Sequence, residues 1–303
     1  MSSVIIDAHS HFFSLSFFET LIKQKNVDAD RAGELARVGK ISGIEIPDEN
    51  IENHTNKWLS EMNKYNVEKM ITFASLPEEA KAVAEAIRIA QGKLIGYTLV
   101  NPLSENSVDF IHKSAEMGFR GLLFFPVMHH YRMFDNKINP VLDAAREHRM
   151  NIIVHFGLLQ VNLRDIIGLP RPFDMQYGNP LDLQITANRY PDTIFVIPHF
   201  GCGFFRETLM LGSLCENVYV DTSSSNSWIK TQPEDLTISS VFEKTAAVFG
   251  VERILFGTDS SVFPRGWRND LYEEQVKAMN EAGFDDRDIG SILSGNINRL
   301  LKN

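Results

Sequence analysis

Short apolar runs alternate with helical patterns along almost the whole of this 303-residue chain, and this alternation restricts the fold more than any other feature. We expect strands at about 4–8, 69–74, 94–100, 121–125, 151–155, 194–199, 217–221 and 253–258. Helices are expected near 48–65, 77–91, 104–117, 138–149, 178–190, 204–215, 233–249, 269–282 and 286–301. Near-continuous apolar strands indicate a parallel sheet buried on both faces. The eight strand–helix units therefore predict an α/β protein, a (β/α)8 TIM barrel that spans residues 1–303 as a single domain.

Two stretches without strands are longer than the others. Residues 12–47 follow the first strand, and residues 156–177 follow the fifth. Both leave the carboxyl end of their strand, where a barrel of this kind keeps its active site. We therefore expect two insertions on this rim that serve as candidate lids.

Charge and composition argue against several classes of protein. The net charge of −9 is unfavourable for nucleic acid or anionic membrane surfaces as main partners. No apolar run approaches the ~18–20 residues of a membrane span, and no signal peptide is visible. Cys202 and Cys215 are too few for a disulfide framework. We predict a cytoplasmic protein with a small-molecule substrate, and a homodimer is compatible with the sequence.

Five side chains able to bind a metal or transfer a proton stand at the predicted carboxyl ends of strands. These are His9, His11, His155, His199 and Asp259. His9 and His11 are two residues apart, so they project to the same side of the first strand. Because strand ends meet at one rim of a barrel, we expect all five to converge there. Three other histidines fall in helical patterns and are interpreted as surface or structural residues: His54, His112 and His148.

This set of side chains suits a mononuclear metal site. Imidazoles with one carboxylate favour Zn²⁺, with Mn²⁺ or Fe²⁺ as alternatives. Such a site keeps one position open for water and lowers its pKa toward about 7. Asp259 is then expected to touch the metal and take a proton from that water. His199 is expected to face the substrate, where it polarises a carbonyl or delivers a proton.

Five segments of the chain, in this order, resemble the amidohydrolase superfamily. They are 6–11 (IDAHSH), 154–155 (VH), 198–201 (PHFG), 256–259 (FGTD) and 295–301 (GNINRLL). More narrowly, they are similar to the amidohydrolase-2 branch, which includes metal-dependent decarboxylases of the aminocarboxymuconate-semialdehyde type, resorcylate decarboxylases, hydratases and lactonases. The resemblance spans nearly the whole chain and independently implies the barrel.

The resemblance also implies roles for single residues. It implies that His199 is catalytic and that one divalent metal ion has four ligands: His9, His11, His155 and Asp259. Many members of the superfamily bridge two metals with a carboxylated lysine at the end of strand four. Segment 118–126 (GFRGLLFFP) contains no lysine, so a single ion is expected here.

Basic side chains after three of the strands suggest that the substrate is anionic. The arginines in these segments are Arg164, Arg171, Arg206, Arg265 and Arg268. A guanidinium group offers a bidentate fork for a carboxylate, and Arg265 or Arg206 is the preferred partner. Segment 263–267, which includes Trp267, is the favoured binding loop. His129 is a further candidate for a substrate contact, with a structural loop role as the alternative.

Three functions are compatible with these patterns. The first is a mononuclear metal hydrolase whose metal-bound hydroxide attacks an amide, ester or lactone of a small, carboxylate-bearing substrate. The second is a metal-dependent, non-oxidative decarboxylase of a small aromatic or unsaturated acid. The third, a non-catalytic binding barrel, ranks last because all five rim residues are present.

Overall fold

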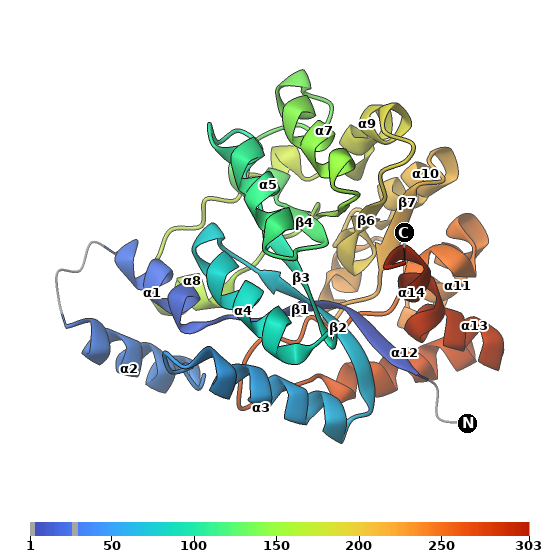
Figure 1. Ribbon diagram of the computed structural model, residues 1–303. Coiled ribbons are helices and arrows are strands. Elements are labelled where there is room, and N and C mark those ends of the chain that lie inside the picture. Colours follow the sequence, from blue (N-terminus) through green and yellow to red (C-terminus); the bar gives the residue numbers. More distant parts are fainter. Residues whose placement is uncertain (1–3, 26–29, 303) are drawn as a thin grey trace.

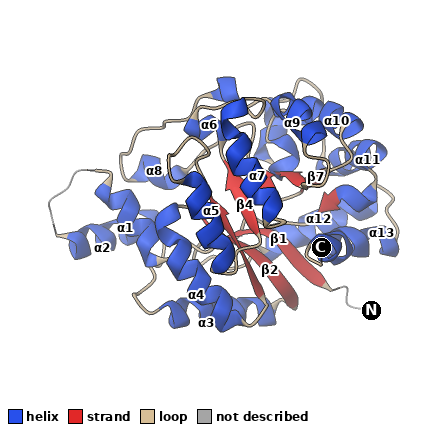
Figure 2. Cartoon of the chain, turned by 45° about the horizontal axis from the view of Figure 1, so that its top comes forward, coloured by secondary structure: helices blue, strands red, loops and turns tan. Residues whose placement is uncertain are grey.

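A computed structural model of the chain describes residues 4–25 and 30–302, and these form a (β/α)8 barrel (Figure 1). Eight parallel strands pair in chain order. They are β1 (Ile5–His11), β2 (Val67–Ala74), β3 (Leu94–Leu99), β4 (Gly121–Phe124), β5 (Asn151–Val154), β6 (Phe195–Ile197), β7 (Val218–Asp221) and β8 (Ile254–Leu255). Figure 2 shows the strands at the centre and the helices around them. The predicted fold class is confirmed.

Helices connect successive strands and cover the outside of the sheet. They are α1 (Leu15–Lys23), α2 (Arg31–Ser42), α3 (Ile51–Lys64), α4 (Ala80–Ala90), α5 (Ser107–Glu116), α6 (Pro126–His129), α7 (Asn139–Glu147), α8 (Asn162–Ile166), α9 (Gln184–Arg189), α10 (Phe205–Leu214), α11 (Ile238–Phe249), α12 (Asn269–Glu281), α13 (Asp286–Gly290) and α14 (Asn296–Leu300). Each predicted helix is found, with ends shifted by a few residues. Within the described ranges, no helix is both long and apolar enough to cross a bilayer.

Side chains alternate between two hydrophobic layers along each strand, as the pleat of a strand requires. The inner layer fills the barrel and consists mainly of Ile6, Ala8, Ile71, Phe73, Tyr97, Leu99, Leu123, Phe125, Ile153, Val196 and Leu255. The intervening strand residues, such as Met70, Leu122 and Ile152, pack outward against the helices. Because both faces of the sheet are buried, the strands read as apolar throughout.

Backbone hydrogen bonds between the two ends of the chain close the barrel. The N–H of Ala8 donates to the carbonyl oxygen of Phe256 at 2.8 Å, and the N–H of His11 donates to that of Ser260 at 2.8 Å. The first strand is thereby joined to the segment that follows β8. Residues separated by about 250 positions meet along this line, which we call the seam.

The two insertions contain three helices that the sequence did not indicate. Helices α1 and α2 follow β1, and α8 follows β5. They lie together at one side of the barrel (Figure 1) and share a small hydrophobic cluster. Its buried members are Phe17, Phe18, Leu21, Ile22, Val38, Ile167 and Leu169. We call these two insertions the cap.

Packing inside the barrel leaves no room for a side chain at Gly121. A Cβ atom at this position in β4 would overlap the buried ring of Tyr97. We expect Gly121→Ala to lower the free energy of unfolding by about 1–3 kcal/mol through overpacking. The control is Gly290→Ala, at a helical glycine whose added methyl group meets nothing within 4 Å. Urea denaturation measures both changes, and equal stabilities of the two variants would refute this account.

Candidate active site

A β-bulge in β1 directs His9 and His11 to the inside of the barrel. Three steps along β1, from Asp7 to Ser10, pair with two steps along β2, from Met70 to Thr72. Both imidazoles then contact Phe73 of the inner layer, with ring centroids 4.7 and 5.1 Å away. The bulge therefore places the two rings together at the carboxyl end of β1.

The outward face of the same strand carries Asp7, whose carboxylate holds the seam. Its Oδ1 accepts from the backbone N–H groups of His9 and Thr258 at 3.0 and 3.1 Å. Its Oδ2 accepts from Thr258 Oγ1 at 2.5 Å and from the indole of Trp267 at 2.8 Å. Burial raises the pKa of Asp7 to about 6, although these four donors act to lower it.

Trp267 lies elsewhere than the sequence suggested. Its side chain is 2% exposed, and its ring packs against Tyr65, Phe256 and Tyr272. With its N–H turned to Asp7, the indole packs behind β1. The loop 263–267 thus contributes a structural anchor at this position.

Asp259 brings a carboxylate to the two imidazoles. Its Oδ1 lies 3.2 Å from His11 Nε2 and 3.8 Å from His9 Nε2. The opposite nitrogens are already held, since His9 Nδ1 lies 2.8 Å from Asp221 Oδ2 and His11 Nδ1 lies 2.6 Å from Ser75 Oγ. Burial alone would raise the pKa of Asp259, but the hydrogen bond and charge of His11, with the charge of His9, lower it well below its usual range.

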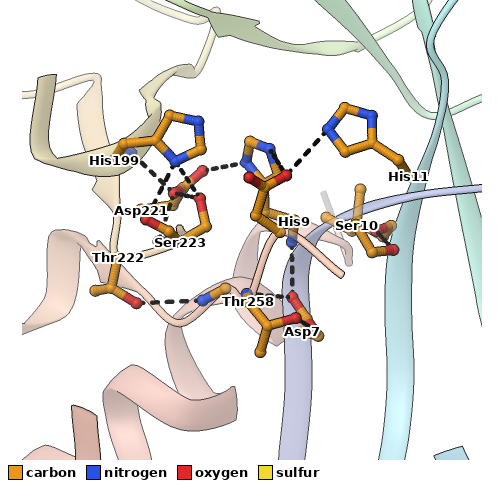
Figure 3. Close-up of polar contacts among 12 residues, drawn as sticks. Asp7, His9, Ser10, His11, His199, Asp221, Thr222, Ser223 and Thr258 are labelled. Atoms are coloured by element: carbon orange, nitrogen blue, oxygen red, sulfur yellow. Dashed lines mark hydrogen bonds and ion pairs between the residues drawn. The ribbon is translucent and has the colours of Figure 1, made fainter. Parts of the chain in front are cut away.

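Asp221 joins His9 to His199. The N–H of His199 donates to Asp221 Oδ1 at 3.1 Å, and the Ser223 hydroxyl donates to the same oxygen. Figure 3 shows the rings of His199, His9 and His11 in a row, with Asp221 and Ser223 below His199. Burial would raise the pKa of Asp221, but the charge and hydrogen bond of His9 lower it to about 2.

The contacts of His199 fix which of its nitrogens carries a proton. Nδ1 lies 2.8 Å from Ser223 Oγ and 3.1 Å from the Ser223 carbonyl oxygen. A carbonyl can only accept, and the hydroxyl hydrogen already points to Asp221. Nδ1 must therefore be the donor, so Nε2 of the neutral ring presents a lone pair to the site.

Both His199 and Asp259 have left-handed backbone conformations, each with φ of 57°. Residues other than glycine rarely adopt this backbone conformation, which costs them about 1 kcal/mol or more. The conformations are held by hydrogen bonds, since the N–H of Asp259 donates to the carbonyl of His9 at 2.9 Å and that of His199 donates to Asp221. Such backbone strain is typical of functional sites.

His155, at the end of β5, lies beside His199 with ring centroids 4.9 Å apart. It is 6% exposed, and burial lowers its pKa well below the usual value. Its buried Nδ1 has no hydrogen-bond partner among the described residues. The ligand atoms of His9, His11 and Asp259 lie within 4.8 Å of one another, and His155 stands outside this group.

These side chains fit a divalent metal ion. His9 and His11 turn the same nitrogen, Nε2, toward one carboxylate oxygen of Asp259. Their Nδ1 atoms are fixed by a carboxylate and a hydroxyl, the usual support for imidazole ligands of metals. His155 adds a buried nitrogen, Nδ1, that has no hydrogen-bond partner among the described residues.

The basic residues predicted to bind substrate lie at the rim to different degrees. Arg265 is exposed and donates to Ser261 Oγ at 2.7 Å, and its charge acts to lower the pKa of His11. Arg206 is exposed in the first turn of α10. His129 ends α6, where burial lowers its pKa to about 4 and leaves Nδ1 without a partner in the described part of the chain.

A buried glutamate behind His11 was missed by the sequence reasoning. Glu79 Oε1 accepts from the N–H and hydroxyl of Ser14 at 2.7 and 3.0 Å, and Oε2 accepts from the N–H of Ser75 at 2.7 Å. Ser75 in turn contacts His11. Burial raises the pKa of Glu79 to about 7 despite these donors. Glu79 thus links the start of the cap to the loop that supports His11.

Asp221 was missed as well, although a signal was present. The predicted strand 217–221 ends in this aspartate, just as three other strands end at His155, His199 or Asp259. No comparable signal marks Ser75 or Glu79, because both act through loop geometry.

A family model described as Amidohydrolase matches residues 6–302 of the chain. None of the curated proteins compared with the chain matches it. Solved structures resemble it over their whole length. One is a probable 2-pyrone-4,6-dicarboxylic acid hydrolase from Acinetobacter baumannii with bound citric acid, with a TM-score of 0.62, 14% identity and 99% of each chain covered.

Two further structures carry metal ions. A 5-carboxyvanillate decarboxylase from Novosphingobium aromaticivorans, complexed with manganese and 4-hydroxy-3-methoxy-5-nitrobenzoic acid, has a TM-score of 0.64 and 16% identity, and covers 100% of this chain and 97% of its own. An amidohydrolase from Burkholderia multivorans with bound zinc has a TM-score of 0.64 and 12% identity, with 99% of each chain covered. At such identities the likeness shows the shared barrel fold.

The raised pKa of Glu79 predicts a pH-dependent stability. Its folded-state pKa of about 7 exceeds the usual 4.5, so its stabilising contribution is lost as the pH rises through this interval. We expect the free energy of unfolding of the unmodified chain to fall by about 2 kcal/mol relative to Glu79→Gln between pH 5 and pH 8.

Urea titrations at the two pH values provide the measurement. The glutamine accepts one hydrogen bond fewer than the glutamate. This loss changes the free energy of unfolding of the variant by the same amount at both pH values, so it does not affect the pH dependence. Glu78→Gln, at the exposed neighbouring position, is the matched control. Parallel pH profiles of Glu79→Gln and the unmodified chain would contradict the expected charge burial.

Proposed function

Since the chain belongs to the amidohydrolase family, we propose that it is a metal-dependent hydrolase acting on an amide, ester or lactone bond of a small, carboxylate-bearing substrate. The observation that carries this proposal is the convergence of His9 Nε2 and His11 Nε2 on Asp259, with the opposite nitrogens held by Asp221 and Ser75.

We assign the metal ligands to the rim group and its neighbour. They are His9, His11, Asp259 and, as the fourth, His155. Their nitrogen and oxygen donors favour Zn²⁺, with Mn²⁺ as the alternative. A divalent ion at this position supplies a Lewis acid that polarises a carbonyl and lowers the pKa of water.

Asp259 is the proposed general base. It takes a proton from the attacking water and returns it to the leaving group. Its hydrogen bond from backbone N–H to the His9 carbonyl holds it at the rim, and its low pKa keeps the carboxylate ionised. The same oxygen that faces the imidazoles is therefore available as a proton acceptor.

His199 is the proposed partner of the substrate carbonyl. Its Nδ1–H is fixed by Ser223, so Nε2 is the atom that faces the reacting group. When protonated, Nε2 donates to the oxyanion that develops during attack. Asp221 stabilises this protonated form through the Ser223 hydroxyl.

Decarboxylation of a small aromatic or unsaturated acid is the second candidate. The observation in its favour is the shared barrel of a 5-carboxyvanillate decarboxylase that binds manganese and a nitrobenzoic acid. His199, once protonated at Nε2, would then deliver this proton to the carbon that loses CO₂. The two reactions differ in their products, since hydrolysis releases a new acid and no CO₂.

Substitution of the base tests the hydrolytic proposal. We expect Asp259→Asn to keep the fold and bind metal but to lose about 10²–10⁴-fold in turnover, because an amide cannot carry the proton. Turnover is followed on a panel of lactones, amides and unsaturated acids by titration of released acid and by CO₂ evolution. Asp174→Asn, whose carboxylate caps a turn elsewhere after β5, is the control.

Elemental analysis should show that Asp259→Asn retains as much zinc or manganese per chain as the unmodified protein. Acid release without CO₂ supports the hydrolase, and CO₂ release supports the second candidate. Near-normal turnover of metal-loaded Asp259→Asn would remove Asp259 from its role as base.

Substrate charge forms a separate prediction. We expect substrates with a free carboxylate to be preferred, because Arg265 can pair with it in a bidentate manner. Arg265→Met should raise KM for the acid but not for its methyl ester, so that the preference disappears. Arg206→Met is the comparison variant at the other predicted arginine. If both variants keep the preference, neither arginine selects the substrate.

A further inference from the structure

A second group of metal-competent side chains lies on the outer helical layer. His112 belongs to α5, Glu147 is the last residue of α7, and His148 follows it. Their ligand atoms all lie within 4.8 Å of one another. None of the three belongs to the rim group formed by His9, His11 and Asp259. The group therefore needs its own explanation.

The two imidazoles face each other edge to face. His112 Nδ1 lies 2.7 Å from His148 Nε2, and the ring centroids are 5.0 Å apart. A hydrogen bond between two ring nitrogens needs one N–H and one lone pair, so at least one ring is neutral. When both rings are neutral, the ring that donates this hydrogen bond can move its proton to its other nitrogen, which faces away from the pair. Both facing nitrogens would then present lone pairs to a single cation.

The separation of the nitrogens is close to what a metal requires. Zinc ligands stand about 2.0–2.1 Å from the ion, which puts two imidazole nitrogens of a tetrahedral site about 3.3 Å apart. The rings therefore need to part by roughly half an ångström, which small side-chain rotations can supply. Glu147 contributes the third ligand from the adjacent position of the chain.

A cavity beside the group leaves room for the remaining coordination position. It measures about 380 Å³, and α5 and α7 form its walls. His112 and Glu147 line it together with Asp143, which lies one turn before Glu147 on α7. Water can reach the proposed ion from this side. The Asp143 carboxylate on the same wall is paired with Arg146, 3.6 Å away, which leaves Glu147 as the carboxylate available to the ion.

We propose that His112, Glu147 and His148 form a second divalent metal site, separate from the rim, that takes a transition metal of the zinc class. Two imidazoles and a carboxylate favour such ions over Mg²⁺, which prefers oxygen ligands throughout. The ion ties α5 to α7 on the outside of the barrel. This assignment departs from the sequence-based interpretation of His112 and His148 as surface or structural residues, and it does not depend on the proposed function.

Zinc titration with a chromogenic competing chelator tests the site in a His9→Ala/His11→Ala chain, which lacks two of the rim ligands. We expect one equivalent of zinc to remain, and MgCl₂ not to displace it. His112→Gln, His148→Gln and Glu147→Gln, each added singly, should weaken this zinc at least about tenfold. The exposed residues His130 and Glu105 supply the controls, His130→Gln and Glu105→Gln.

The unmodified chain gives an independent reading if the doubly substituted chain does not fold. There, His112→Gln should lower the zinc content from two equivalents to one while activity is retained. Loss of rim metal would instead reduce activity, so failure of this site and failure of the proposed function are distinguishable. Unchanged zinc binding in all three variants would show that the two histidines form only a hydrogen bond and would overturn the proposal.

Discussion

The buried carboxylate of Asp7 determines how the rest of the site is built. It accepts hydrogen bonds from His9 on one side of the seam and from Thr258 and Trp267 on the other. His9 carries one imidazole of the site, and Asp259 directly follows Thr258 in the chain. Closure of the barrel and the arrangement of the site thus depend on the same carboxylate, although the segments it joins lie about 250 residues apart in the chain.

Two residues with proposed chemical roles have strained backbone conformations. His199 and Asp259 share the same left-handed conformation, and they lie in the turns that follow β6 and β8. The backbone N–H groups of these two residues donate hydrogen bonds to the Asp221 carboxylate and the His9 carbonyl, and these bonds offset the unfavourable backbone energy.

Much of this architecture could be predicted because apolar periodicity reports burial directly. The strands and helices follow from it, and so does the placement of His9, His199 and Asp259 at one rim. The bulge in β1 could not be predicted, because one extra residue in a pairing leaves no mark in an apolar run. The bond from the Trp267 indole to Asp7 could not be predicted either, because an aromatic residue near a site packs equally well behind a strand or in front of it.

One carboxylate, Asp221, serves two imidazoles that have different proposed tasks. Its Oδ2 holds Nδ1 of His9. Its Oδ1 accepts from the backbone N–H of His199 and from the Ser223 hydroxyl, which in turn contacts the His199 ring. Under the proposed function, the metal ligand His9 and the proton donor His199 are therefore held by the same carboxylate. A substitution that moves Asp221 would disturb both His9 and His199. New substrate specificities are therefore more accessible through substitutions in the cap and the rim loops than through changes at the imidazoles.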